Sequence, residues 1–159
     1  MVKVLFVCLG NICRSPMAEG VFRKMVDDDK LDPFISCDSS GTSSYHIGEL
    51  PDKRMRETAQ RFGIQLTHKA RQLKVQDLEV FDYIIAMDDS NLSNIHLLKD
   101  KCKSIRCNFF LMREFDDFKN SPDVPDPYYG GSDGFIEVFD ILDRSCRNLL
   151  EYIKKEHKI

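Results

Sequence analysis

Residues 2–19 read V-K-V-L-F-V-C-L-G-N-I-C-R-S-P-M-A-E, and this stretch decides the fold. Its apolar run, 2–7, is short, β-branched and unbroken, which is typical of a strand covered on both faces. The run ends at Cys8, five loop residues follow, and Arg14-Ser15-Pro16 then opens a predicted helix. We expect Ser15 to be the N-cap and Pro16 to lie in the first turn. The stretch therefore predicts a cysteine that faces a helix N-terminus.

The same alternation continues along the chain. Further strands are predicted at 34–38, 81–87 and 105–111, and helices at 51–62, 88–98 and 135–153. Polar or irregular segments at 39–44, 67–73 and 113–134 separate them. Strand and helix in repeated alternation predict an α/β three-layer sandwich, with a four-stranded parallel sheet and helices on both faces. This is a flavodoxin-like or Rossmann-like arrangement, and we expect one domain over residues 1–159.

The composition of the chain argues against nucleic-acid binding, secretion and insertion into a membrane. The formal net charge is −3 and the pI about 5.8, so no basic footprint predicts nucleic-acid binding. The fractions of hydrophobic (42%) and charged (31%) residues are those of a folded globular protein. The N-terminal apolar run is too short for a signal peptide, and no run of about 18 apolar residues predicts a membrane span. We expect a cytoplasmic protein with no membrane partner.

The six cysteines do not predict a disulfide scaffold. A chain of this length without a secretory signal does not need such staples. Four of the cysteines lie in contexts that favour packing as small apolar side chains: Cys37, Cys102, Cys107 and Cys146.

The loop after Cys8 has the composition of an anion site. Its N–H groups can converge on one centre at the helix N-terminus, and Gly10 and Asn11 are residue types that accept left-handed φ values. Arg14 offers a planar fork that matches two phosphoryl oxygens. A helix N-terminus and a nearby cation favour the thiolate form of a cysteine, and the Ser15 hydroxyl can donate to it. The loop predicts that Cys8 attacks a phosphate ester.

Three other interpretations of this loop are weaker. Cys8 taken alone would be a buried structural cysteine, but the joint pattern of strand, cysteine, loop, arginine and helix disfavours that. A zinc site with Cys8 and Cys13 lacks a matching Cys or His pair downstream. A nucleotide-binding loop is excluded because the Gly-Lys-[Ser/Thr] ending is absent.

The loop contains no acid to protonate a leaving group, so one must come from elsewhere. Asp126, in V-P-D-P-Y-Y-G-G, lies between two prolines on the long irregular segment. A carboxyl held over a phosphate dianion can stay protonated long enough to act as a general acid. An ordinary turn is the alternative for this motif, and Asp116, Asp117 and Asp123 remain alternatives for the acid.

The stretches V-C-L-G-N-I-C-R-S-P-M-A-E-G and D-P-Y-Y-G strongly resemble the low-molecular-weight protein tyrosine phosphatases. Further matches lie in D-S-S-G-T, H-K-A-R-Q, F-D-Y-I-I-A-M-D-D-S-N-L and the C-terminal helix. The resemblance implies a phosphocysteine intermediate, no metal and no cofactor. It also implies activity on phosphotyrosine proteins and small aryl phosphates, an acid-phosphatase activity, and binding of phosphate, sulfate or other oxyanions.

The resemblance also implies roles for individual residues. Cys8 would be the nucleophile, Arg14 the phosphate clamp, and Asp126 the acid and later the base for water. The phosphate-binding loop would consist of Leu9, Gly10, Asn11, Ile12, Cys13, Arg14 and Ser15. Residues that hold its shape by hydrogen bonds would be Asn11, Ser15, Ser39 and His68. Contacts that set substrate specificity would come from Leu9, Ile12, Tyr45, Tyr128 and Tyr129.

Cys13 matches a cysteine that can form a protective disulfide with Cys8 on oxidation. We expect a monomer with weak self-association at most.

Two other functions remain as alternatives. An arsenate reductase shares this fold and loop but needs additional cysteines on a mobile segment, and Cys102 and Cys107 are the one close pair. A catalytically silent phosphotyrosine-binding or redox-sensing module would lack Cys8, Arg14 or Asp126, and all three are present.

Overall fold

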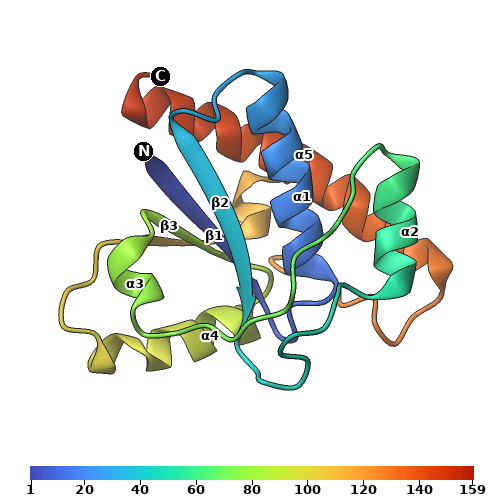
Figure 1. Ribbon diagram of the computed structural model, residues 1–159, viewed down its shortest axis with the longest axis horizontal. Coiled ribbons are helices and arrows are strands. Elements are labelled where there is room, and N and C mark those ends of the chain that lie inside the picture. The colour runs from blue at the N-terminus through green and yellow to red at the C-terminus, as the bar shows by residue number, and fades with distance from the viewer.

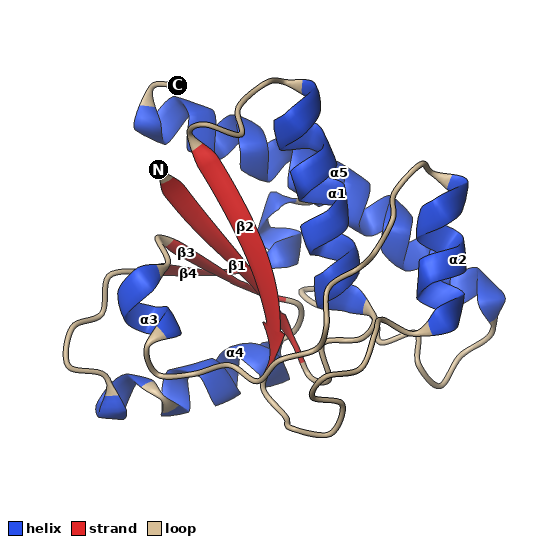
Figure 2. Ribbon diagram, in the orientation of Figure 1, coloured by secondary structure: helices blue, strands red, loops and turns tan.

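The computed structural model describes residues 1–159, the side chain of Ser132 excepted. Four strands, β1 (Val2–Cys8), β2 (Ile35–Gly41), β3 (Tyr83–Ala86) and β4 (Asn108–Leu111), form one sheet in the order β2-β1-β3-β4. Every neighbouring pair is parallel (Figure 2). The predicted four-stranded parallel sheet is confirmed.

Helices cover both faces of this sheet (Figure 1). On one face lie α1 (Arg14–Asp28) and α5 (Ser132–His157), with α2 (Lys53–Arg61) packed against α5. The other face carries α3 (Asp77–Val80) and α4 (Asp89–Leu97). Two 3₁₀ turns, η1 (Lys99–Lys101) and η2 (Met112–Phe115), flank β4. The chain is thus the expected three-layer α/β sandwich.

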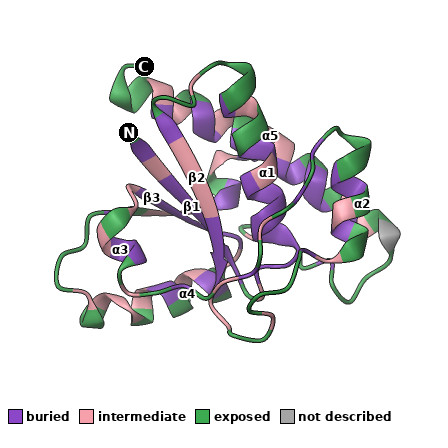
Figure 3. Cartoon of the chain, in the orientation of Figure 1, coloured by how far each residue is buried: buried purple, intermediate pink, exposed green. Residues whose placement is uncertain are grey.

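The central strand β1 explains why its sequence is an unbroken apolar run. Val4 and Phe6 point into the core under α1 and α5, whereas Leu5 and Val7 point into the core under α3 and α4. All four side chains are completely buried, as the buried colour along β1 in Figure 3 illustrates. Burial of each such side chain stabilises the fold by about 1.5–3 kcal/mol.

The strand order places a topological switch point at the end of β1. From β1 the chain first adds β2 on one side and later adds β3 on the other. Loops that leave the carboxyl ends of β1 and its neighbours therefore part around Cys8, where ligands of open α/β sheets bind. Both chain termini lie at the opposite end of the sheet (Figure 1).

Several predicted boundaries were wrong. β2 extends to Gly41, so Ser39 and Ser40, predicted in a loop, pair with Phe6 and Val7. Polar residues belong in this strand because its last residues form the floor of a polar site. β4 begins at Asn108 and not at 105, because the Arg106 N–H just before it donates to the Leu78 carbonyl of α3 and not to β3. The short helix α3 and both 3₁₀ turns were not predicted.

The predicted helices at 51–62 and 88–98 are present as α2 and α4, each with an aspartate as its N-cap. Asp52 is the N-cap of α2, where its carboxylate accepts the Arg54 N–H, and Asp88 caps α4 in the same way. Gly63, predicted to end the second helix, has φ of +75°. In the described part of the chain, no helix is long and apolar enough to cross a membrane.

Candidate active site

Cys8 lies buried at the carboxyl end of β1, directly before the loop that leads into α1. The Asn11 N–H donates to its Sγ at 3.3 Å, and Ser15 Oγ lies 2.9 Å from the same sulfur. Four other loop N–H groups donate to no acceptor within the described residues, those of Leu9, Gly10, Ile12 and Cys13. Free donors around a sulfur at a helix N-terminus form a site for an anion.

Asn11 fixes the shape of this loop. Its backbone is left-handed, with φ of 57°, as the sequence predicted. Its Nδ2 donates to Ser15 Oγ at 2.8 Å and to Ser39 Oγ at 3.0 Å. Its Oδ1 accepts from His68 Nε2 at 2.9 Å and from the Arg71 N–H at 3.0 Å. All four residues predicted to support the loop therefore meet in one hydrogen-bonded group.

Ser15 does not cap α1, contrary to the prediction. The N-cap is Cys13, which makes no side-chain capping bond, and Ser15 lies inside the first turn. Ser15 Oγ accepts from Asn11 Nδ2, and its own hydroxyl proton has two acceptors in reach, Cys8 Sγ at 2.9 Å and the Ser40 carbonyl at 3.3 Å. The Ser15 hydroxyl therefore contacts the sulfur of Cys8 and does not cap the helix.

Space at Gly10 is tight, and its backbone angle does not call for glycine. It does not share the left-handed conformation of Asn11, which corrects the prediction. A Cβ built at Gly10 would lie 3.0 Å from His46 Cδ2. At Gly41 a Cβ would lie 2.6 Å from the Leu9 carbonyl oxygen, so the end of β2 and the loop can approach only with glycine there.

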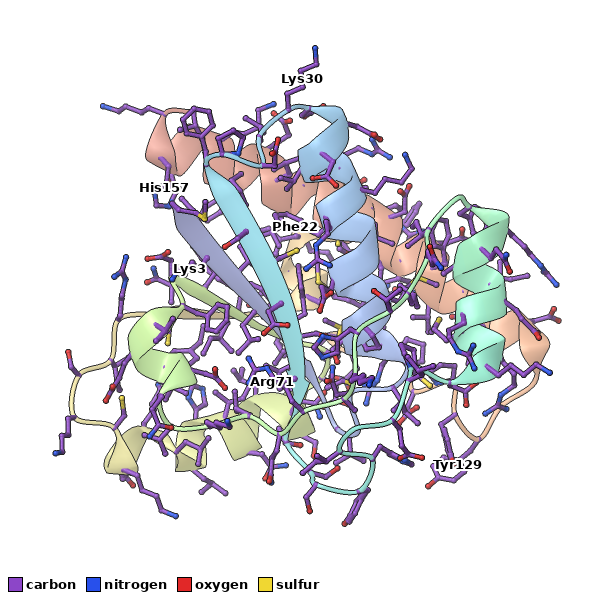
Figure 4. The ribbon with its side chains drawn as sticks, viewed as in Figure 1. Lys3, Phe22, Lys30, Arg71, Tyr129 and His157 are labelled. Carbon is purple, nitrogen blue, oxygen red and sulfur yellow. The ribbon has the colours of Figure 1, made fainter. Side chains whose placement is uncertain are left out.

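A second layer of charged residues lies behind Asn11, and the sequence did not reveal it. Glu19 Oε1 accepts from Ser39 Oγ at 2.8 Å and lies 3.2 Å from His68 Nδ1. Asp38 Oδ1 lies 3.4 Å from the same nitrogen. Because Asn11 Oδ1 is an amide oxygen and can only accept, His68 Nε2 is the donor in the bond that joins them. The position of Arg71 at the end of β2 is visible in Figure 4.

Glu19, Asp38 and His68 are also the described residues that could hold a metal ion, with ligand atoms within 4.8 Å of one another. Arginines already pair with both carboxylates, Arg23 with Glu19 and Arg71 with Asp38. Their charges are thus already paired, and we interpret these three residues as the support of the loop after Cys8 and not as a metal site.

Arg14 connects the loop to the distant part of the chain. Its guanidinium is 3% exposed and donates to Asp88 Oδ2 at 2.7 Å and to the Val124 carbonyl at 3.0 Å. Its Nη2 lies 3.4 Å from Asp126 Oδ2. Burial alone would lower the pKa of Arg14, but the negative charges of Cys8, Asp88 and Asp126 raise it above its ordinary value. Asp88 was not predicted here, because its only evident role was to cap α4.

Among the four aspartates considered for the acid, only Asp126 reaches Arg14 and the pocket at Cys8. Asp116 is buried between two arginines. Asp123 accepts the first N–H of α4, and Asp117 faces α5. Asp126 keeps a side chain that is 36% exposed, with Oδ1 accepting the Tyr128 N–H at 3.0 Å.

A pocket of about 90 Å³ opens above Cys8. All five predicted contact residues line it: Leu9, Ile12, Tyr45, Tyr128 and Tyr129. His46 also lines it and was not predicted. Tyr45 and Tyr129 are 77% and 90% exposed, so they form the rim, and Figure 4 shows Tyr129 at the edge of the molecule. The walls are aromatic and the floor is polar.

All six cysteines are free thiols, but only Cys8 and Cys13 line the pocket. Burial, then the negative charges of Asp52, Cys8 and Asp126, raise the pKa of Cys13 far above its ordinary value. Cys8 is the better placed nucleophile because the Asn11 N–H and the Ser15 hydroxyl contact its sulfur, and the disulfide between the two cysteines stays a prediction. Of the cysteines predicted to be packed, Cys107 and Cys146 are buried, whereas Cys37 and Cys102 are only half-buried.

Known proteins match this chain from end to end. The family model described as low molecular weight phosphotyrosine protein phosphatase matches residues 3–159. Proteins of that name from Schizosaccharomyces pombe and Homo sapiens are 46% and 43% identical, over 96% and 94% of this chain and 97% and 94% of their own.

Solved structures agree with these relatives. A protein tyrosine phosphatase from Entamoeba histolytica superimposes with a TM-score of 0.87 at 42% identity and covers 100% of both chains. A structure described as a Drosophila arginine phosphatase has a TM-score of 0.92 at 34% identity, over 96% of this chain and 98% of its own.

Proposed function

The chain belongs to the low molecular weight phosphotyrosine protein phosphatase family, and we propose that it acts through attack of Cys8 on phosphorus with Asp126 as the acid. The enzyme is a phosphatase, and its substrates are phosphoproteins or other phosphate esters. We infer that the catalytic unit is a single domain spanning residues 1–159.

The observation that carries this mechanism is that the start of α1 joins both parts of the site. Its Arg14 contacts Asp126, and its Ser15 contacts the sulfur of Cys8. The guanidinium lies 3.4 Å from Asp126 Oδ2, and Ser15 Oγ lies 2.9 Å from Cys8 Sγ. A phosphoryl group above Cys8 would meet the free loop N–H groups and the fork of Arg14. The oxygen that leaves would then face Asp126.

In the first step, the Cys8 thiolate donates an electron pair to phosphorus and forms an S–P bond. The bond between phosphorus and the tyrosyl oxygen breaks, and that oxygen takes the proton of Asp126. In the second step, Asp126 takes a proton from water while the water oxygen bonds to phosphorus. The S–P bond breaks, its electron pair returns to Cys8, and inorganic phosphate leaves. No metal or cofactor takes part in either step.

The shape of the pocket supports phosphotyrosine and small aryl phosphates as substrates. Aromatic rings form its rim, and Leu9 and Ile12 add apolar contact for the ring of a substrate. A phosphoserine side chain is shorter and would not fill these walls. Since one structural neighbour is described as an arginine phosphatase, phosphoarginine belongs in any comparison of substrates.

The experiment that tests the mechanism replaces Cys8 by Ser. We expect the variant to lose turnover of p-nitrophenyl phosphate, because a serine hydroxyl is a far weaker nucleophile than a thiolate at neutral pH. Binding of inorganic phosphate, measured by calorimetry, should survive because Arg14 and the loop N–H groups remain. Cys102→Ser is the matched control, since Cys102 does not line the pocket, and it should keep full turnover.

Turnover retained in Cys8→Ser would contradict the mechanism. An arsenate reductase would differ in another way: it would couple arsenate to oxidation of thioredoxin or glutathione without phosphatase turnover. Arsenate-dependent oxidation that is lost in Cys102→Ser would favour that alternative, because reduction of arsenate requires further cysteines.

A further inference from the structure

A second groove continues from the catalytic pocket toward α4 and η1. It has a volume of about 540 Å³ and lies between the segment after β2 and the end of α4. Leu9 and Tyr45 line both this groove and the catalytic pocket, so the two are continuous. A molecule bound above Cys8 can therefore extend into the groove without leaving the surface.

The groove is lined by leucines and by uncharged polar side chains, and it carries a single charge. Leu9 and Leu97, which both line it, are 41% and 69% exposed. Lys101 is its one charged lining residue, and no Asp or Glu lies among the lining residues described. Within the described part of the chain, Lys101 forms no ion pair. On a protein of net charge −3, Lys101 is thus a cation that no lining residue of the groove compensates.

The wall of the groove also offers main-chain groups. The backbone N–H and C=O of Ser44 and Tyr45 make no hydrogen bond to any described residue. The Thr42 hydroxyl is likewise buried without a partner among the described residues. Ser43 holds this wall to the catalytic loop, because its N–H and its hydroxyl both donate to the Leu9 carbonyl at 3.0 Å. Free backbone groups along a pinned segment are suited to an extended polypeptide.

The opposite rim of the catalytic pocket is less suited to an acidic segment. Arg54, the cation over the ring of Tyr128, pairs with Asp52 Oδ2 at 3.0 Å and donates to the Tyr128 carbonyl at 3.1 Å. The positive charge there is already compensated, whereas that of Lys101 is not.

We propose that this groove receives the polypeptide next to the phosphotyrosine of a protein substrate, with an acidic side chain against Lys101 and an apolar one on Leu97. The inference rests on the proposed function, because the phosphotyrosine itself must occupy the pocket at Cys8. It deepens that function from aryl phosphates in general to proteins with an acidic flank. A small aryl phosphate ends at Leu9 and does not reach Lys101.

The test compares phosphotyrosyl peptides that carry glutamates or lysines on either flank of the phosphotyrosine. We expect kcat/KM to be about five-fold higher for the acidic peptide on one flank, the effect of one partly exposed ion pair at its upper range. Lys101→Glu should remove or reverse this preference. Turnover of p-nitrophenyl phosphate should change less than about two-fold, because that substrate does not enter the groove.

Lys103→Glu is the matched control. It makes the same change in net charge at an exposed lysine two residues away that does not line the groove. The inference is supported if Lys101→Glu alters the peptide preference and Lys103→Glu does not. Equal effects of the two variants, or no preference in the parent enzyme, would overturn it. If the parent enzyme did not turn over p-nitrophenyl phosphate at all, the proposed function itself would be refuted.

Discussion

Replacement of Asn11 by Ala tests whether the loop is held by its side chain. The change removes four hydrogen bonds, two donated to Ser15 and Ser39 and two accepted from His68 and the Arg71 N–H. Asn11 is completely buried, so the groups that it leaves behind cannot all turn to water. The substitution also places alanine at φ of 57°, where asparagine is better tolerated.

The expected loss of stability is large. Four hydrogen bonds at about 1 kcal/mol each contribute about 4 kcal/mol, and the left-handed alanine adds about 1 kcal/mol more. Since a domain of this kind is stable by about 5–15 kcal/mol, Asn11→Ala should unfold at much lower denaturant concentration. Asn11→Gly loses the same bonds without the backbone strain, so it should be about 1 kcal/mol more stable than Asn11→Ala.

Urea unfolding of both variants measures these differences, and turnover of p-nitrophenyl phosphate reports on the loop. We expect kcat/KM to fall in both, because the Asn11 N–H donates to Cys8 Sγ and moves with the loop. Inhibition by inorganic phosphate should weaken in parallel. If Asn11→Gly were as stable as the parent protein and bound phosphate equally well, the loop would not depend on this side chain.

Two further predictions concern single aspartates. Asp126→Asn should slow alkyl phosphates by about 10²–10⁴-fold and p-nitrophenyl phosphate much less, since a good leaving group needs no acid; equal slowing of both would contradict the role of Asp126. Asp116→Asn should cost about 3 kcal/mol at neutral pH, as loss of one partner of a buried ion pair does. Burial would raise the pKa of Asp116, but hydrogen bonds and charge from Arg144 and Arg113 lower it below its ordinary value. The unfolded chain therefore binds more protons, so the stability that Asp116 contributes is present above about pH 4 and is lost as pH falls further. Urea unfolding between pH 3 and pH 7 should show this loss in the parent protein and a flatter profile in Asp116→Asn.

The catalytic loop could be predicted from the sequence because its parts are consecutive. Cys8, Asn11 and Arg14 lie within one tight turn, and a loop this short leaves few ways to place them. β1 was predicted for a similar reason, since burial on both faces leaves an unbroken apolar run. Asp126 could be found by its unusual proline-flanked motif, although only the fold excludes Asp116, Asp117 and Asp123.

The support behind the loop could not be predicted, because it joins residues from separate elements. Glu19 lies on α1, Asp38 on β2 and Arg71 on the segment that follows α2, and each alone looks like an ordinary surface charge. Their proximity follows from the parallel pairing of β1 with β2, which brings Ser39 beside Phe6. The polar residues at the end of β2 were predicted to lie in a loop. Strand propensity is judged from the residue type alone and does not include the strand that pairs with it.

Arg14 and Asp88 show why one residue can carry two roles that a sequence does not separate. Asp88 Oδ1 accepts the Asn91 N–H and caps α4, while Oδ2 holds Arg14 Nη1 at 2.7 Å. One nitrogen of Arg14 is thus fixed by β3 and its following helix, and the other faces Asp126. Since Asp88 and the Val124 carbonyl hold the guanidinium, we expect it to stay in place when a phosphoryl group binds while Asp126 turns toward the leaving oxygen. A fixed cation beside a carboxyl that can move is the arrangement that the proposed proton transfer needs.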